Sequence, residues 1–224
     1  MLELDREFLE GHLPFLSRLE ELDRQLLLSS AVQAGFHAGD AVQNRQQECN
    51  GLVLVQSGQL RALFETEDGK QITLYRLLAG DICVLTASCV LRHITFEVTL
   101  EAEKQSTLIF VPAAVLAALS GRSFAVKEFV ADLVAERFSE VMWVVEQMVS
   151  RNMGQRVGAF LLEQSNLEGS DTVSITHEVI ARNLGTAREV VSRVLKYLEG
   201  EGLLRLSRGQ VHITQRKRLQ QLAQ

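Results

Sequence analysis

Three charged side chains and one hydroxyl between residues 188 and 193 have the types and spacing needed to read the edges of DNA bases. They are Arg188, Glu189, Ser192 and Arg193. An arginine can donate two parallel hydrogen bonds to guanine O6 and N7, and a glutamate can accept one from cytosine N4. Because residues three and four apart share one face of a helix, the group predicts recognition of a short word that contains G·C pairs.

Other polar side chains nearby suit the phosphate groups of the same DNA. Lys196 lies about one helical turn beyond Arg193, where an ammonium group would meet the backbone rather than a base. We expect Thr176, His177 and Arg208 to contact the backbone as well. The alternative is an ordinary amphipathic helix whose charged face is simply solvated.

Two short helices with a tight turn between them would position these side chains. The hydroxyl of Thr176 can cap the first helix, and Gly185 follows it where a sharp turn favours a positive φ. The first helix has an apolar stripe of Val179, Ile180 and Leu184. The second turns its apolar residues inward: Val190, Val191, Val194, Leu195 and Leu198. This arrangement predicts a helix-turn-helix, whose second helix enters the DNA major groove.

Beyond the second helix, two short strands are predicted around a glycine turn, the hairpin of a winged helix. The strands are Leu203–Leu206 and Val211–Ile213. Residues 151–213 together resemble the DNA-binding domain of the CRP/FNR family of bacterial transcription regulators, because residues 188–193 meet both of its patterns, Arg-Glu-x-x-x-Arg and x-Glu-x-x-Ser-Arg. The resemblance implies a homodimer, an N-terminal β-roll sensor, a long connecting helix, and double-stranded DNA and RNA polymerase as partners.

The N-terminal half changes from helical to strand periodicity near Val32. Residues 3–31 are predicted to be mostly helical, with Pro14 starting a second short helix. Short strands at intervals of about ten residues then alternate with glycine turns, and the last two are predicted over residues 94–102 and 107–111. This pattern favours an antiparallel sandwich or roll. The turn glycines have a spacing similar to that of the cyclic-nucleotide-binding roll: Gly39, Gly58, Gly69 and Gly80.

One long helix is predicted over residues 123–150, after a short helix, Ala113–Ser120, that Gly121 interrupts. Its apolar residues at alternating three- and four-residue steps form a coiled-coil seam: Ala131, Val134, Phe138, Val141, Val145 and Met148. A two-fold dimer needs such a seam between its sensor domain and its DNA-binding domain. The alternative is a long helix packed within its own chain.

The region that would hold an effector departs from the cAMP-binding members of the family. Those members have Gly-Glu and an arginine followed by a small residue, whereas this chain has Gly80-Asp81 and Arg92-His93. We therefore expect no cAMP response. The N-terminal iron–sulfur cluster of other members is not expected either, because no cysteine precedes Cys49.

Two cysteines and a histidine occupy this region instead: Cys83, Cys89 and His93. They indicate a thiol, metal or haem redox sensor, and the alternative is that both cysteines are small buried hydrophobes. In a straight strand their Cα atoms would lie about 20 Å apart, whereas a disulfide needs less than about 7 Å, so only a bend could join them. The sequence does not identify the effector.

Composition and charge fit a soluble protein with two modest domains. The 224 residues are 46% hydrophobic and 23% charged, no apolar run has the length of a membrane span, and the acidic start is unlike a signal peptide. Three cysteines without an export signal favour a reducing cytoplasm. Residues 1–150 carry 12 Lys and Arg against 21 Asp and Glu (net −9), and residues 151–224 carry 11 against 7 (net +4). The basic part is therefore the helix-turn-helix part.

These observations predict an α+β chain in three parts: a β-roll sensor with a helical cap (residues 1–120), a dimerisation helix (121–150) and a winged helix-turn-helix (151–224). The predicted function is a transcription regulator that binds an inverted repeat with TGA half-sites, under control of a signal at the roll. We expect no catalytic residue, no metal site and no membrane partner. Two other classes remain: a receptor that signals only through protein partners, and a thiol-dependent enzyme, although no recognisable triad surrounds Cys83 or Cys89.

Overall fold

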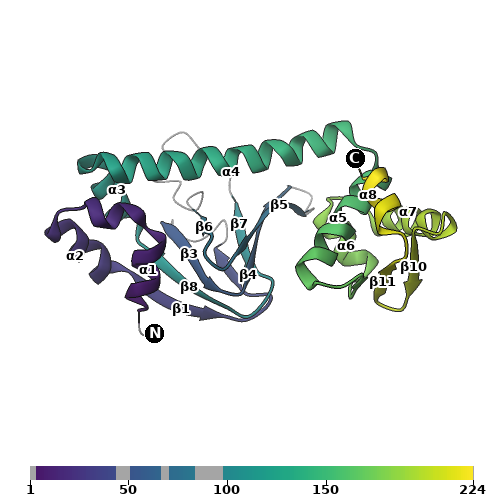
Figure 1. Cartoon of the computed structure of the whole chain (residues 1–224), viewed down its shortest axis with the longest axis horizontal. Helices are drawn as coiled ribbons and strands as arrows, with labels where there is room; N and C mark the ends of the chain where they lie inside the picture. The colour runs from purple at the N-terminus through teal and green to yellow at the C-terminus, as the bar shows by residue number, and fades with distance from the viewer. Residues whose placement is uncertain (1–3, 44–50, 67–70, 84–97, 224) are drawn as a thin grey trace. The chain divides into compact units, whose positions relative to one another are not determined.

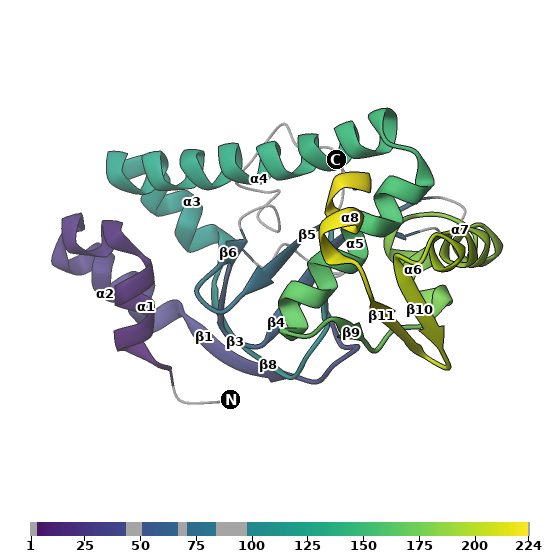
Figure 2. The same cartoon turned by 45° about the vertical axis from the view of Figure 1, so that its right-hand side comes forward.

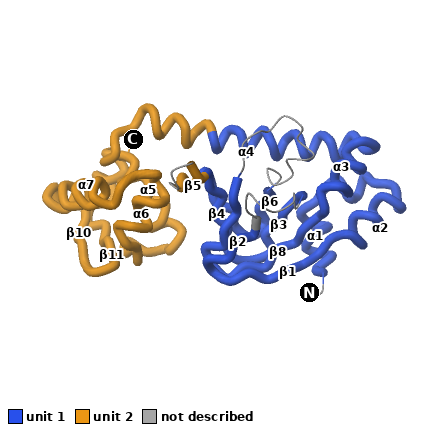
Figure 3. Tube along the Cα trace, turned by 180° about the vertical axis from the view of Figure 1, so that it is seen from behind, with its two compact units in different colours: residues 1–64, 74–141 blue, residues 65–73, 142–224 orange. Residues whose placement is uncertain are grey.

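The structure, a computed structural model, describes residues 4–43, 51–66, 71–83 and 98–223 (Figure 1). The chain divides into two compact units, Met1–Phe64 with Leu74–Val141, and Glu65–Thr73 with Met142–Gln224 (Figure 3). The predicted α+β class, a β-roll followed by a long helix and a winged helix-turn-helix, is confirmed. No helix within the described residues is long and apolar enough to cross a membrane.

Short helices gather at one end of the first unit (Figure 1). They are α1 (Arg6–His12), the 3-10 helix η1 (Pro14–Arg18), α2 (Glu21–Ser30) and α3 (Ala113–Arg122). Pro14 begins η1, where its fixed φ suits a first turn and its missing N–H is not needed. The predicted interruption at Gly121 is wrong, because α3 continues to Arg122 and ends only where Ser123 turns extended. A glycine in the exposed last turn of a helix costs too little to break it.

The roll consists of two antiparallel four-stranded sheets. One has the order β1-β8-β3-β6, formed by Val32–Phe36, Ser106–Val111, Leu52–Ser57 and Ile82–Cys83. The other has the order β2-β7-β4-β5, formed by Ala41–Gln43, Thr99–Ala102, Gln59–Glu65 and Gln71–Leu78. β1 was not predicted as a strand. The strand predicted over residues 94–102 is β7 in its last four residues, and residues 94–97 lie outside the described part of the chain.

Strand β3 explains how the roll is packed on both faces. Leu52, Val53, Leu54 and Val55 are all fully buried, because successive side chains of a strand point to opposite faces and both faces are covered. Leu52 and Leu54 pack into a core shared with the helices, and Val53 and Val55 into a core between the two sheets. Continuous apolar sequence here reflects a sheet covered on two sides.

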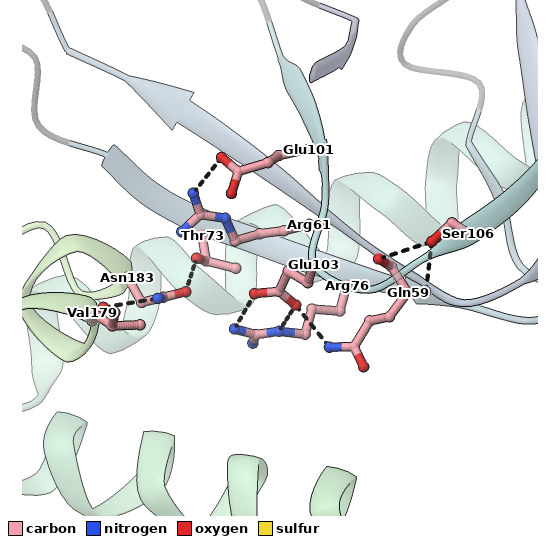
Figure 4. Close-up of polar contacts among 9 residues, drawn as sticks. All are labelled: Gln59, Arg61, Thr73, Arg76, Glu101, Glu103, Ser106, Val179 and Asn183. Carbon is pink, nitrogen blue, oxygen red and sulfur yellow. Dashed lines mark hydrogen bonds and ion pairs between the residues drawn. The ribbon is translucent and has the colours of Figure 1, made fainter. Parts of the chain in front are cut away.

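Two ion pairs lie on the second sheet, one between the neighbouring strands β4 and β7 and one between β5 and the turn after β7 (Figure 4). Arg61 is only 1% exposed and pairs with Glu101 at 3.1 Å. Arg76 donates from Nε to Glu103 Oε2 at 2.7 Å, and Gln59 Nε2 donates to the same oxygen, also at 2.7 Å. Because these charges are paired and hydrogen-bonded, the sheet accommodates two arginines at positions that are almost closed to solvent.

Helix α4 (Phe124–Ser150) is the predicted long helix. One side, with Val126, Val130, Leu133 and Arg137, is buried in the first unit. Of the predicted seam, Val134 and Val141 pack partly against that unit's own cores, whereas Phe138, Val145 and Met148 are exposed. Met142 and Val149 extend the exposed apolar stripe. The helix therefore combines the intramolecular packing offered as an alternative with an apolar surface that its own chain leaves exposed.

Four helices and a small sheet lie wholly within the described residues of the second unit. Helix α5 (Met153–Glu168) begins with a capping box in which Asn152 and Gln155 satisfy each other's backbone N–H groups. The helices α6 (His177–Asn183) and α7 (Arg188–Gly200) follow, and α8 (Arg216–Leu222) packs on α5. Figure 2 shows the sheet β10-β11-β9, formed by Leu204–Ser207, Gln210–Ile213 and Thr172–Val173. Neither β9 nor α8 was predicted.

Candidate nucleic-acid interface

Helices α6 and α7 are joined by the tight turn that the sequence predicted. The hydroxyl oxygen of Thr176 accepts a hydrogen bond from the backbone of Val179 at 3.3 Å, which caps α6. Gly185 has φ of +64°, and the backbone N–H of Thr186 donates to Ala181 O at 3.0 Å to close the turn. Ala181 is buried between the helices, where a larger side chain would hold them apart. These contacts fix the angle at which α7 leaves the turn.

The apolar side of α7 anchors the helix in the core of the second unit. Val191, Leu195 and Leu198 are fully buried, and Val194 is partly buried against the same core. Val190, which was predicted to point inward, is half-buried. Because the buried positions recur every three to four residues, the opposite face of α7 must point outward.

The outward face of α7 carries Arg188, Glu189, Arg193 and Lys196, all of them exposed. Within the described residues, none of the four has a hydrogen-bond or ion-pair partner. Their guanidinium, carboxylate and ammonium groups are thus available for a ligand. The structure places Arg188 and Glu189 in the first turn of α7 and Arg193 about one turn further on.

Ser192 does not stand free among these residues. Its Oγ lies 2.8 Å from Nδ1 of His177, the first residue of α6, and both side chains are half-buried. The sequence placed these two residues separately, Ser192 at a base and His177 at the backbone. They lie on different helices, so no local spacing could reveal the contact.

The wing lies in the same unit and is tied to α7. The backbone N–H of Leu206 donates to Glu199 Oε1 at 2.8 Å, and the side chains of Thr172 and His212 contact each other at 2.9 Å across β9 and β11. Arg208 is exposed in the turn between β10 and β11. A cation at the tip of a wing is suited to a phosphate group.

The C-terminal end of α6 is held by residues outside the two helices. Arg156 of α5 donates to the backbone oxygen of Leu184 at 2.7 Å, and burial lowers the pKa of Arg156. Thr73 donates to Asn183 Oδ1 at 2.6 Å, and Asn183 Nδ2 donates to Val179 O at 2.9 Å (Figure 4). These bonds satisfy polar groups at the turn, which supports a fixed geometry there.

In the first unit, Cys83 lies in the interior of the roll. It is fully buried, and its Sγ is 3.5 Å from the hydroxyl of Tyr75. Arg137 of α4 places its guanidinium 5.2 Å from the centre of the Tyr75 ring and donates to Ile82 O at 3.3 Å. Burial, and then the neighbouring Cys83, raise the pKa of Tyr75 well above its ordinary value, so its phenol stays protonated. A thiol of the roll is thus linked through Tyr75 to the long helix.

The other two effector candidates, Cys89 and His93, lie outside the described residues. Within the ranges that are described, no three His, Cys, Asp or Glu side chains gather in a way that could hold a metal ion. Of the three predicted effector residues, Cys83 is therefore the one that the described residues include.

Comparison with known families agrees with this geometry in both units. Residues 155–222 match the family model of the Crp-like helix-turn-helix domain. Residues 34–123 match the family model of the cyclic nucleotide-binding domain.

Individual relatives extend over nearly the whole chain. A crystal structure described as a transcriptional regulator of the Crp/Fnr family from Eubacterium rectale is 41% identical, with 96% of this chain and 99% of that chain covered and a TM-score of 0.92. The fumarate and nitrate reduction regulatory protein of Vibrio cholerae is 26% identical over 218 residues, 92% of this chain and 83% of that protein. FixK2 from Bradyrhizobium japonicum is 19% identical over 87% of this chain and 98% of its own, with a TM-score of 0.66, and shows the fold alone.

Proposed function

The chain belongs to the CRP/FNR family of transcription regulators, with a helix-turn-helix DNA-binding domain, and on this premise we propose that it acts as a homodimer on an inverted repeat with TGA half-sites. The observation that supports this most directly is the outward face of α7, where two guanidinium groups and a carboxylate have no partner among the described residues.

Arg188, Glu189, Ser192 and Arg193 would contact bases in the major groove. Arg188 or Arg193 would donate two hydrogen bonds to the guanine of the half-site, and Glu189 would accept from the amino group of its cytosine. A TGA half-site and its complement contain one guanine and one cytosine, which form a single base pair that suits one arginine and Glu189. The anchored apolar side of α7 supports this assignment, because bidentate contacts require a fixed helix.

Thr176, His177, Lys196 and Arg208 would contact the DNA backbone and set the register of the helix. The hydroxyl oxygen of Thr176 already accepts one hydrogen bond, which leaves its O–H as the donor to a phosphate. Lys196 and Arg208 are exposed cations on α7 and on the wing. These contacts would carry affinity rather than sequence preference.

Dimerisation would cover the exposed apolar stripe of α4. Phe138 is 63% exposed and lies one or two helical turns from Met142 and Val145, which are also exposed. Such a stripe on a monomer is unusual, and a second copy of the same helix buries it symmetrically. A dimer also places two recognition helices about one turn of DNA apart, roughly 34 Å.

The signal would act at the roll, and Cys83 is the group proposed to receive it. A peroxide could oxidise its thiol to a sulfenic acid with release of water, and the added oxygen would disturb the contact with Tyr75 beside Arg137 of α4. The competing interpretation is that Cys83 is a small core residue. A haem or metal effector remains a proposal that rests on the residues Cys83, Cys89 and His93. RNA polymerase as a partner remains a proposal that rests on the family resemblance. The relatives from Eubacterium rectale and Vibrio cholerae are described as regulators, which favours this function over a thiol-dependent enzyme.

The first experiment is fluorescence anisotropy of the purified protein on a duplex with the inverted repeat TGA…TCA, and on a duplex of the same composition with scrambled half-sites. We expect binding to the repeat that is at least tenfold tighter. Equal binding to both duplexes would contradict the proposal. Repeating the titration after mild peroxide treatment, with Cys83→Ser as the control, decides whether this thiol carries the signal.

A further inference from the structure

His177 and Ser192 form the one polar side-chain contact between α6 and α7 that the described residues show. His177 begins α6, and Ser192 lies between Arg188 and Arg193 on the outward part of α7. The contact of 2.8 Å has the length of a good hydrogen bond. A histidine at this position can therefore determine how a hydroxyl of the base-reading face is used.

Proton counting limits what the pair can do. A neutral imidazole has one N–H, on either Nδ1 or Nε2, and a hydroxyl has one O–H and two lone pairs. If Nε2–H of His177 donates to a phosphate, Nδ1 is left as an acceptor. The hydroxyl of Ser192 must then donate its only proton to Nδ1, and only lone pairs remain for the DNA.

We propose that His177 is a positioning residue that fixes the Ser192 hydroxyl as an acceptor, so that Ser192 reads an exocyclic amino group, adenine N6 or cytosine N4. This inference rests on the proposed function. A serine without such a partner rotates its hydroxyl and serves donors and acceptors alike. The pair also couples a backbone contact to a base contact, since the proton on Nε2 sets the role of Nδ1.

The neighbours of Ser192 make such an acceptor useful. Arg188 and Arg193 can only donate hydrogen bonds, and Glu189 is the other acceptor in the group. A keto oxygen opposite the Ser192 hydroxyl would face its lone pairs, with no proton to form a hydrogen bond. Ser192 therefore disfavours a base that presents a keto oxygen at this position.

The test measures binding by the dimeric protein to duplexes that carry each of the four base pairs, in turn, at every position of the half-site. The variants are His177→Ala, Ser192→Ala, their combination and His177→Asn, whose amide oxygen can accept where Nδ1 does. Glu178→Gln, the exposed neighbour of His177 on α6, is the control. Thermal unfolding of each variant shows whether the fold is kept.

We expect one position at which the unmodified protein prefers adenine or cytosine, whose amino groups lie in the major groove, by roughly tenfold. His177→Ala and Ser192→Ala should each abolish this preference, the combination should do no more, and His177→Asn should restore part of it. Glu178→Gln should leave the base profile unchanged. If His177→Ala lowers stability, the profile of His177→Asn decides.

Three outcomes would overturn the inference: a preference for guanine or thymine at that position, an equal loss for all sequences in His177→Ala, or additive effects in the double variant. If Ser192→Ala alters no base preference while Arg188→Ala and Glu189→Ala alter theirs, this inference fails and the proposed function stands. If the unmodified protein binds all of the duplexes equally, the proposed function itself is wrong.

Discussion

At the scale of single residues, α7 separates two kinds of DNA contact. Arg188, Glu189 and Arg193 carry groups that distinguish bases, and Lys196 carries a point charge that does not. All four are exposed and have no partner among the described residues. Substitutions at the two kinds of position should therefore differ in how their effects depend on DNA sequence and on salt.

Glu189→Ala should relax discrimination at one C·G pair by about 1–3 kcal/mol, because a single acceptor for cytosine N4 is lost. The measurement compares the affinity of both proteins for duplexes with each base pair at that position. Glu201→Ala, which removes an exposed carboxylate just after α7, is the control and should keep the original profile. If substitutions in the operator cost the same before and after Glu189→Ala, the assignment of Glu189 is wrong.

Lys196→Ala should weaken binding to all sequences and reduce the slope of log affinity against log salt by about one, because one fewer counterion is released from the DNA. A salt titration of the affinity measures this slope. Lys104→Ala removes the same charge from the roll and should leave the slope unchanged. An unaltered slope in Lys196→Ala would remove this residue from the phosphate contacts.

At the scale of elements, the sequence predicted those helices and strands whose apolar residues follow a regular period. Helices α4, α6 and α7 and the two hairpin strands of the wing were found, because their apolar residues recur over a full element. Strand β9 has two residues and forms only by pairing with β11, so it carries no period of its own. The contact of His177 with Ser192 was missed for a related reason, since it depends on how two helices cross.

The turn between α6 and α7 offers a test of stability. Gly185 has φ of +64°, which costs an L-residue about 1–2 kcal/mol, so Gly185→Ala should lower the free energy of unfolding by at least that amount. Gly200→Ala is the control, because Gly200 lies within α7 and a methyl group there meets no atom within 4 Å. Urea unfolding of both variants decides. Equal stability of the two would show that the turn tolerates alanine.

At the scale of the whole molecule, the account depends on two chains acting together. One chain supplies one recognition helix, and an inverted repeat requires two that are related by a two-fold axis. The partly buried Val134 and Val141 show that two positions assigned to the dimer seam also pack on their own unit. The sequence alone does not distinguish an apolar residue that packs both on its own chain and on a partner from one that packs on only one of them.

Phe138→Glu should convert the dimer to a monomer, because a carboxylate on the exposed stripe of α4 would be buried without a partner. Sedimentation velocity measures the change in mass, and affinity for the inverted repeat should fall with it. Ser139→Glu introduces the same charge at the next, exposed residue and should leave the dimer intact. A dimer that survives Phe138→Glu would require a different interface.

The most direct test of the central claim is selection of binding sites from a pool of random duplexes, which assumes no operator. The account predicts enrichment of an inverted repeat of TGA and TCA, with half-site centres about one turn of DNA apart. Enrichment of a single unrepeated motif would contradict the dimer, and an inverted repeat without TGA would contradict the assignment of Arg188, Glu189 and Arg193.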